Sequence, residues 1–554
     1  MRRIVLIINI LALTLCMGSC AKQGMPSGGP KDVTPPKTRA TQPENKTLSF
    51  AEKSFYVEFD EYVVLKDADN NILVSPPMKN KPEYKTKGHG IQVKINDTLQ
   101  PNTTYLFQFK NAIADLNEGN LLPSFEYVFS TGDVIDSLSL HGRVLDAQQQ
   151  IPRKETVTVM LYDASKKNQL QIVSDSDSVA SPEPLYVTRC DSTGRFKFNY
   201  IRDGVYYVVA VEDGDKNLQV GKSEAVAFSN SHYTATPMNA TDSTGKSDIA
   251  LNIFEPDVSV QRITGSGFVK QGMITVSTLK PMQQPVVNAG TEKTFCHLNN
   301  GRDTLTIWTL NEKCDSLRFV VSDPSGLQDT LKLRLPTRKK GQVVQSDSKS
   351  ADISLNYKQL PYFDTLRIVS KIPLDTAKCL TDSVVSILQL KDSSLARCGV
   401  TLDSSLMAMA LPYPFKQGEK YLIRVEKDVF HDIYGNANDS LQSEVSVTSA
   451  EQYGKIIINV QSDSLMAETP LIVELLDGKG NVKATEKCNG NAKITFKNLL
   501  PDKYRVRVIA DENNNGKWDT GDYSKGRQPE RVIYMKKTID LRANWDFEEK
   551  MIIE

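Results

Sequence analysis

A run of acids and amides near the C-terminal end of the chain has the composition and spacing of a calcium-binding loop. It reads ADENNNGKWDTGDY over residues 510–523. Oxygen-bearing side chains stand at positions 1, 3, 5, 9 and 12 of a twelve-residue count, supplied by Asp511, Asn513, Asn515, Asp519 and Asp522. Gly516 is sixth, where such a loop turns sharply, and Lys517 would offer its backbone carbonyl at position seven.

These residue types suit Ca²⁺, a hard cation that takes six to eight oxygen ligands. The predicted flanks are strands rather than the helices of an EF-hand, and position 12 is Asp rather than Glu. The spacing is similar to the calcium loops of Gram-positive surface repeats. The alternative is an Asx-rich turn whose side chains bond their own backbone. The loop predicts Ca²⁺ as a cofactor, and nothing else in the sequence indicates another one.

A related loop occurs earlier in the chain with a weaker pattern. Asp213, Asp215 and Asn217 fit positions 1, 3 and 5, and Glu224 falls at position 12. Leu218 replaces the glycine, however, and position 9 lacks a carboxylate. The sequence therefore favours a solvated turn here.

Motifs of enzymatic chemistry are missing from the sequence. The five histidines are scattered, with no HExxH motif and no pair at ligand spacing, and no nucleophile elbow, P-loop or dinucleotide fingerprint occurs. Adjacent carboxylates such as Asp60 and Glu61 would point to opposite faces of a strand. We predict that the protein is not an enzyme.

The N-terminal twenty residues predict an export signal. MRRIVLIINILALTLCMGSC has two arginines, a short apolar run and then small residues before Cys20. The apolar run is too short for a bilayer span, so it indicates a signal peptide. Met17-Gly18-Ser19-Cys20 resembles the lipobox of bacterial lipoproteins, and the resemblance implies that Cys20 carries the lipid. The Pro- and Gly-rich stretch that follows is typical of an extended tether.

Composition limits the partners. The net charge is zero, so there is no electrostatic footprint for nucleic acid. Of eight cysteines, six would remain after Cys16 is removed and Cys20 is acylated. Cys296 with Cys314, and Cys379 with Cys398, are close enough in sequence to pair, although spacing alone does not fix connectivity.

Most of the chain alternates apolar and polar residues over five to eight positions and then breaks at Gly, Pro, Asn or Asp. Segments such as SFYVEF, YYVVAV and YRVRVIA have the period of two and the β-branched and aromatic content of half-buried strands. No long amphipathic helix stands out. The remaining length exceeds one core, so we predict an all-β chain built from several antiparallel β-sandwiches.

Two pairs of similar segments divide the chain into repeated parts. Residues 102–120 match residues 418–438, each with a Tyr-led strand, an apolar pair, an Asp and an Asn/Gly turn. Residues 194–217 match residues 492–516, each with a strand, a tight turn, a second strand ending in Ala and an acidic loop.

The first pair resembles the bacterial Ig-like domain of S-layer proteins, and the second is similar to transthyretin-like or carboxypeptidase-regulatory-like sandwiches. Together with the N-terminus, the chain resembles Ig-like-domain lipoproteins of Bacteroidota-type outer membranes. The resemblance implies about five Ig-like and transthyretin-like antiparallel β-sandwiches. The predicted divisions are signal peptide and lipobox 1–20, tether 21–45, Ig-like domain 46–133, transthyretin-like sandwich 134–250, divergent sandwich 251–345, second Ig-like domain 346–450 and transthyretin-like sandwich 451–554.

A short tripeptide recurs through the chain. Asp-Ser/Thr followed by Ala, Val, Leu or Thr occurs thirteen times, against about three expected from composition. It resembles the acceptor site of Bacteroidota O-glycosylation, in which the middle hydroxyl carries the glycan. The alternative is that Asp-Ser/Thr simply suits turns.

These observations predict a lipid-anchored envelope protein that binds or scaffolds other components. The expected partners are the membrane, through the N-terminal lipid, and envelope proteins or glycans. The periplasmic face is slightly favoured because Ala21-Lys22-Gln23 carries no acid. The alternatives are an accessory subunit of an outer-membrane assembly, export or uptake machine and, last, a glycan-binding or glycan-processing protein.

Overall fold

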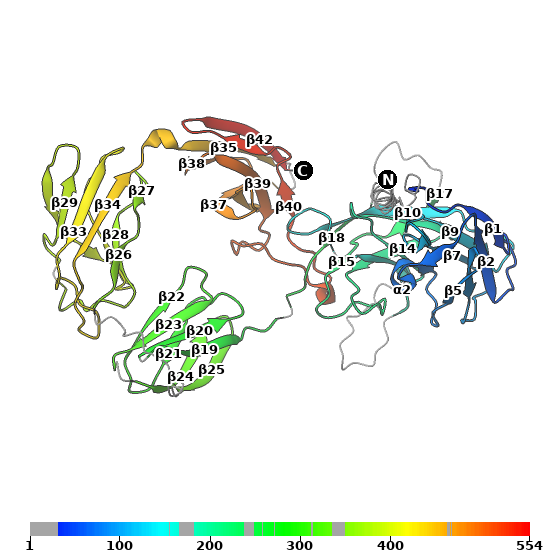
Figure 1. The fold of residues 1–554 in the computed structure, drawn as a ribbon, viewed down its shortest axis with the longest axis horizontal. Coiled ribbons are helices and arrows are strands. Elements are labelled where there is room, and N and C mark those ends of the chain that lie inside the picture. The colour runs from blue at the N-terminus through cyan, green and yellow to red at the C-terminus, as the bar shows by residue number, and fades with distance from the viewer. Residues whose placement is uncertain are drawn as a thin grey trace, which may run out of the picture. The chain divides into compact units, whose positions relative to one another are not determined.

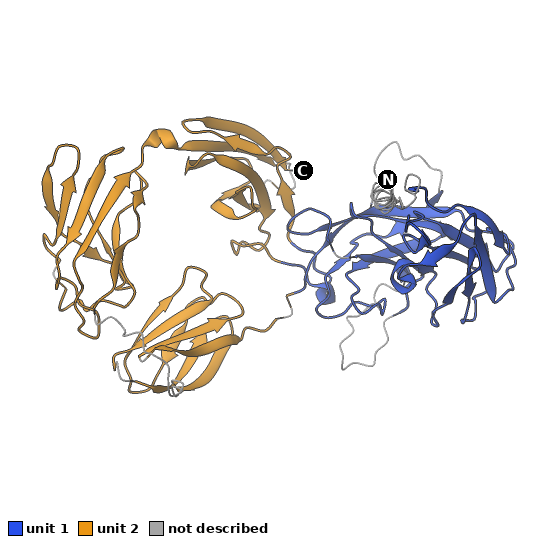
Figure 2. Cartoon of the chain, viewed as in Figure 1, with its two compact units in different colours: residues 1–256, 520–529 blue, residues 257–519, 530–554 orange. Residues whose placement is uncertain are grey.

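The computed structural model confirms the all-β fold, with many short sheets and almost no helix (Figure 1). It describes residues 32–154, 156–165, 182–237, 249–257, 259–270, 272–311, 314–334, 350–379, 381–462, 466 and 468–553. The predicted signal peptide, Cys20 and residues 21–31 of the predicted tether lie outside these residues. The described part of that tether, residues 32–45, includes a strand, β1 (Thr38–Gln42). Two compact units are present, one of residues 1–256 with 520–529 and one of residues 257–519 with 530–554 (Figure 2).

The first sandwich lies in unit 1 and buries an aromatic core. Its elements are β1 (Thr38–Gln42), β2 (Ser54–Phe59), β3 (Val63–Leu65), α2 (Ala68–Asn71), β4 (Leu73–Ser75), β5 (Glu83–Lys87), β6 (Gly90–Lys94), β7 (Thr104–Gln108), β8 (Ile113–Asp115) and β9 (Glu126–Ser130). Sheet β1-β2-β6-β5 packs with β4-β7-β9. Phe55, Val57 and Phe59 alternate along β2 and are buried, as the period of two predicts.

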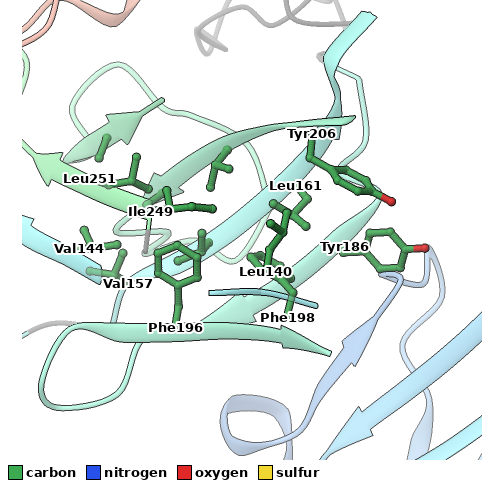
Figure 3. Close-up of a cluster of buried hydrophobic side chains, with 14 of the residues drawn as sticks. Leu140, Val144, Val157, Leu161, Tyr186, Phe196, Phe198, Tyr206, Ile249 and Leu251 are labelled. Atoms are coloured by element: carbon green, nitrogen blue, oxygen red, sulfur yellow. The ribbon is translucent and has the colours of Figure 1, made fainter. Parts of the chain in front are cut away.

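The second sandwich, also in unit 1, pairs two sheets around eighteen buried apolar residues. Its strands are β10 (Leu138–Asp146), β11 (Thr158–Asp163), β12 (Tyr186–Arg189), β13 (Arg195–Ile201), β14 (Val205–Val211), β15 (Val226–Phe228), β16 (Tyr233–Thr234), β17 (Thr236–Pro237) and β18 (Ile249–Ile253). Phe196 and Phe198 of β13 and Ile249 and Leu251 of β18 point into this core (Figure 3).

Unit 2 begins with the third sandwich, which was predicted only as a divergent one. Its strands are β19 (Ile263–Lys270), β20 (Met273–Thr278), β21 (Val286–Asn288), β22 (Thr294–Leu298), β23 (Thr304–Thr309), β24 (Ser316–Asp323) and β25 (Leu327–Arg334). Sheets β19-β20-β23-β22 and β21-β24-β25 enclose a core that includes Ile307 and Phe319.

The fourth sandwich repeats features of the first. Its strands are β26 (Ile353–Leu355), β27 (Gln359–Leu360), β28 (Arg367–Ser370), β29 (Val385–Gln389), β30 (Leu395–Cys398), β31 (Thr401–Leu402), β32 (Ala408–Ala410), β33 (Lys420–Val425) and β34 (Leu441–Val447). In each of the two, a buried tyrosine hydroxyl accepts the backbone N–H five residues earlier: Tyr105 from Gln100 at 2.9 Å and Tyr421 from Lys416 at 3.0 Å.

The fifth sandwich repeats the topology of the second. After the short helix η2 (Ala450–Gln452) come β35 (Gly454–Ser462), β36 (Pro470–Leu476), β37 (Val482–Asn489), β38 (Ala492–Leu499), β39 (Asp502–Ala510), η3 (Tyr523–Lys525), β40 (Val532–Tyr534), β41 (Ile539–Leu541) and β42 (Asp546–Ile553). Tyr206 and Tyr504 each donate to the carbonyl four residues earlier, both at 2.8 Å.

Most strand pairs are antiparallel, as expected, but the echoed sandwiches share a feature that alternation did not reveal. Strand β10 pairs in parallel with β18, and β35 pairs in parallel with β42. The fourth sandwich has a short parallel pair, β27 with β34. Inward and outward side chains alternate in the same way in both kinds of ladder, so the sequence pattern cannot distinguish them.

Candidate functional site

The acidic loop begins where β39 ends, and its first residue is inside the protein. Asp511 is only 1% exposed, and its N–H donates to Pro470 O at 2.9 Å. Its carboxylate accepts two backbone N–H groups, from Asn515 at 2.9 Å and from Gly516 at 2.8 Å. Gly516 has a φ of 80°, the left-handed conformation that the sixth position of such a loop requires.

The amides and the second acid converge on the same turn. Asn513 Oδ1 accepts Asn515 N–H, and Asn515 Oδ1 accepts Lys517 N–H, both at 3.0 Å. The side-chain amides of Asn513 and Asn515 both donate to Asp519 Oδ2, each at 2.5 Å. The ammonium of Lys517 lies 3.7 Å from Asp519 Oδ1. The structure therefore brings four of the predicted oxygen donors together: Asp511, Asn513, Asn515 and Asp519.

Asp522, predicted at position 12, is engaged elsewhere. Its carboxylate caps the short helix η3, accepting Lys525 N–H at 3.2 Å and Ser524 Oγ–H at 2.6 Å. Lys525 Nζ lies 2.9 Å from it. These bonds lower the pKa of Asp522 to about 2, with Ser524 as the largest cause. Asp522 also belongs to unit 1, whereas Asp511–Asp519 belong to unit 2.

Glu530, which the sequence analysis missed, closes the loop instead. It is 7% exposed and accepts Glu512 N–H at 3.1 Å and Asp519 N–H at 2.9 Å. Its own N–H donates to Asp519 O at 3.0 Å, and its carbonyl accepts Trp518 Nε1–H at 2.9 Å. Burial, followed by the charges of Asp519 and Asp511, raises the pKa of Glu530.

The earlier loop has the same geometry, which the sequence analysis did not foresee. Leu218, in the place of Gly516, takes the same left-handed conformation with a φ of 57°. Glu224 accepts Gly214 N–H at 3.1 Å and Gly221 N–H at 2.8 Å, which are the positions that Glu530 binds in the later loop. Both glutamates stand two residues before the returning strand. That shared spacing is a signal in the sequence that could have identified Glu530.

Three carboxylates meet in this earlier loop. One oxygen from each of Asp213, Asp215 and Glu224 lies within 4.8 Å of the others. Burial of Asp213, helped by Asp215 and Glu224, raises its pKa to about 6. Like charges this close repel, and a cation among them would relieve the repulsion.

The cysteines do not pair as their spacing suggested. Cys190, Cys296, Cys314, Cys379, Cys398 and Cys488 are all free thiols. The predicted pairs Cys296–Cys314 and Cys379–Cys398 are therefore not present in the structure. Burial raises the pKa of the Cys379 and Cys398 thiols.

Two segments of the chain match known family models. Residues 32–131, which include the first sandwich, match the bacterial Ig-like domain. The chain therefore carries a bacterial Ig-like domain. Residues 447–525, which reach into the acidic loop, match a family described as an uncharacterised protein conserved in bacteria. No curated protein matches the chain.

Several solved structures align with this chain at low sequence identity and low TM-score. Surface layer protein SbsC, domains 1–6, is 12% identical, with 92% of this chain and 68% of that chain covered and a TM-score of 0.13. BcpA, the major pilin subunit of Bacillus cereus, is 9% identical, and the alignment covers 75% of this chain and 98% of that chain with a TM-score of 0.14. A third structure is the mixed-linkage glucan utilization locus protein SGBP-B of Bacteroides ovatus in complex with a mixed-linkage heptasaccharide. It is 11% identical, and the alignment covers 66% of this chain and 88% of that chain with a TM-score of 0.17.

Among the described residues, no helix has the length and apolar character needed to cross a bilayer.

The crowded carboxylates of the earlier loop predict a pH-dependent stability. The raised pKa of Asp213 means that its charged form costs stability once the pH rises above its ordinary value of 3.8 and through about 6. Asp215→Asn, which copies Asn513, removes one repelling charge. In chelator at pH 7 we expect the melting temperature of the second sandwich to rise by about 2–4 °C, and to equal that of the wild type near pH 4.

Asp203→Asn is the control, because Asp203 is an exposed acid of the same sandwich. Scanning calorimetry from pH 4 to 7 measures both variants. An Asp215→Asn protein that is no more stable than wild type at pH 7 would contradict the repulsion.

Proposed function

We propose that the protein is a non-enzymatic, lipid-anchored protein of the cell envelope whose sandwiches bind or hold together other envelope components. The proposal is supported by the bacterial Ig-like domain and by the lipobox at Met17–Cys20. The outer membrane is the proposed membrane, with the periplasmic side favoured.

The proposal that the protein is not an enzyme rests on the hydrogen bonds made by its buried aspartates. Asp115, Asp432 and Asp511 are each about 1% exposed or less. The carboxylate of each accepts hydrogen bonds from backbone N–H groups of its own turn. A carboxylate used in this way holds a loop and is poorly placed to move a substrate proton. These three buried carboxylates therefore stabilise their own turns.

The lipid anchor is tested by Cys20→Ser in the native host. Without the cysteine there is no acylation site, so we expect the protein to move from the membrane fraction to the soluble fraction. Ala21→Ser is the matched control and should stay with membranes. Retention of the Cys20→Ser protein on membranes after a carbonate wash would refute the lipid anchor.

We further propose that the acidic loop binds Ca²⁺. The support is the convergence of Asp511, Asn513, Asn515 and Asp519 on one turn, with Glu530 beside them. Backbone bonds occupy part of the acceptor capacity of Asp511 and Asp519, and carboxylate oxygens retain lone pairs for a cation. Lys517 would contribute its carbonyl, and Asp522 is left out of the ligand set because it caps η3.

Calcium at a hundredfold excess over Kd would stabilise the folded state by about 2.7 kcal/mol. We therefore expect the melting transition of the fifth sandwich to rise by at least about 4–8 °C, and by less with Mg²⁺, which prefers a tighter octahedral shell. Asp519→Ala should remove one calcium equivalent from the full chain, since its N–H and carbonyl still bond Glu530. Titration calorimetry counts the ions.

Glu512→Ala is the matched control, because Glu512 is an exposed acid of the same loop and only its backbone N–H is engaged. It should keep the full stoichiometry. Equal stoichiometry in the wild type and Asp519→Ala would reduce the loop to an Asx turn.

We also propose O-linked glycans on the recurring tripeptides. Ten of the thirteen lie in the described residues, and eight of those expose the middle hydroxyl residue: Thr98, Ser137, Ser192, Ser316, Thr330, Thr376, Ser383 and Ser440. The other three, centred on Ser178, Ser243 and Ser464, lie outside the described residues.

Intact mass spectrometry of the protein from its native host should give a mass above that of the acylated polypeptide. Ser440→Ala should reduce the mass by one glycan, whereas Ser443→Ala, a residue outside the tripeptides, should not. A mass equal to the bare acylated chain would exclude glycosylation.

A further inference from the structure

The two acidic loops differ by one insertion. In the earlier loop, Lys222 and Ser223 are the only residues between Gly221 and Glu224. In the later loop, ten residues, Thr520–Pro529, separate the equivalent Asp519 and Glu530. These ten residues are the part of the later loop that packs into unit 1 (Figure 2). We call Thr520–Pro529 the arm.

The arm makes specific polar contacts with the second sandwich. Thr520 Oγ1 donates to Glu255 O at 2.7 Å. Gln528 Nε2 donates to Phe228 O at 2.8 Å and to Asn230 Oδ1 at 2.9 Å. Both ends of the arm are therefore anchored on the segments that follow β15 and β18.

Between these anchors the arm covers aromatic side chains. The ring of Tyr523 meets Phe228 edge to face, with centroids 5.4 Å apart. Gly521 is buried against Phe254, and a Cβ there would come within 2.4 Å of that ring. Burial raises the pKa of Tyr523, and the charges of Tyr207 and Tyr162 raise it further.

The covered surface is the side of the second sheet opposite the sandwich core. Tyr162 and Tyr207 are each 3% exposed, Phe228 is 5% exposed and Phe254 is 1% exposed, yet none belongs to the core of the sandwich. Strands β11 and β14 are accordingly buried on both faces, unlike the usual alternation of a sandwich strand. We call these four residues the aromatic face.

The surface beneath the arm contains a cluster of ion pairs. Arg153 binds three carboxylates, Asp146 at 2.8 Å, Glu212 at 2.5 Å and Glu255 at 3.0 Å. Glu255 is the residue whose carbonyl accepts Thr520. The base of the arm is also fixed, because Asp519 and Glu530 bond each other through the N–H of each. Pre-ordering on both sides lowers the entropic cost of docking.

We propose that Thr520–Pro529 is a docking arm whose receptor is the aromatic face, and that docking within the same chain masks this face as an interaction surface. Displacing the arm would uncover the rings of Phe228 and Phe254 beside the ion pairs of Arg153. A surface of this composition suits an apolar or aromatic segment of another protein.

The test uses the full chain and two variants of the arm. Gly521→Val places methyl groups against Phe254, and Tyr523→Ala removes the ring on Phe228. We expect both to speed hydrogen exchange of the Val226 and Phe254 amides, which bond each other's carbonyls, by about tenfold or more. Both should also increase the fluorescence of an apolar dye, because the aromatic face is uncovered.

Three controls separate docking from folding. Tyr523→Phe keeps the ring and should behave as wild type. Arg527→Ala changes an exposed residue of the arm, and Gly265→Val adds the same side chain in β19 at a glycine with open space around it. Exchange in β13 should be unchanged in every variant.

Two outcomes would overturn the proposal. The first is equal exchange of Val226 and Phe254 in the wild type, Gly521→Val and Tyr523→Ala. The second is a wild-type oligomer that Gly521→Val converts to a monomer by light scattering, because it would assign the arm to the face of a second copy.

Discussion

In each sandwich an aspartate in or beside a turn accepts backbone N–H groups with its carboxylate. Backbone N–H groups in the turns lack a sheet partner, and leaving them unbonded in a buried place costs about 1–3 kcal/mol each. One aspartate in every sandwich accepts two or more of these groups: Asp115, Asp213, Asp323, Asp432 and Asp511. Bonds of this kind lower the pKa of Asp115 and Asp323 against the opposing effect of burial. The loops are thereby as well defined as the strands.

This constraint explains why a structural aspartate and a cation ligand look alike in sequence. A carboxylate has about four acceptor sites, so two backbone bonds leave room for a metal ion. Asp511 and Asp213 begin turns with the same backbone bonds, yet their neighbours differ. The earlier loop gathers three carboxylates, whereas the later one places the amides of Asn513 and Asn515 between its acids. Without a bound ion, the repulsion among carboxylates is therefore larger in the earlier loop than in the later one. The earlier loop has Leu218 where the later loop has Gly516.

The sequence predicted what is periodic or local and missed what is set by distant pairing. The period of two predicted the alternation along β2. The similarity of residues 102–120 to residues 418–438 predicted the tyrosines at the second positions of β7 and β33. The parallel partners of β10 and β35 could not be predicted, because ladder direction leaves no trace in alternation. Counting twelve contiguous positions chose Asp522, but the chain leaves the loop after Asp519 and returns at Glu530. The comparison of both loops in space reveals this return.

The insertion in the later loop shows how a sandwich gains a contact without a change to its core. Lengthening a surface loop costs little, since the closure entropy grows only with the logarithm of its length. The cost falls further here because Asp519 and Glu530 bond each other, so the base of Thr520–Pro529 is as closely held as in the earlier, shorter loop. Asp519 serves both structures: its side chain faces the amides of the turn, and its backbone closes the arm. The proposed calcium loop and the proposed docking arm therefore share one residue, Asp519.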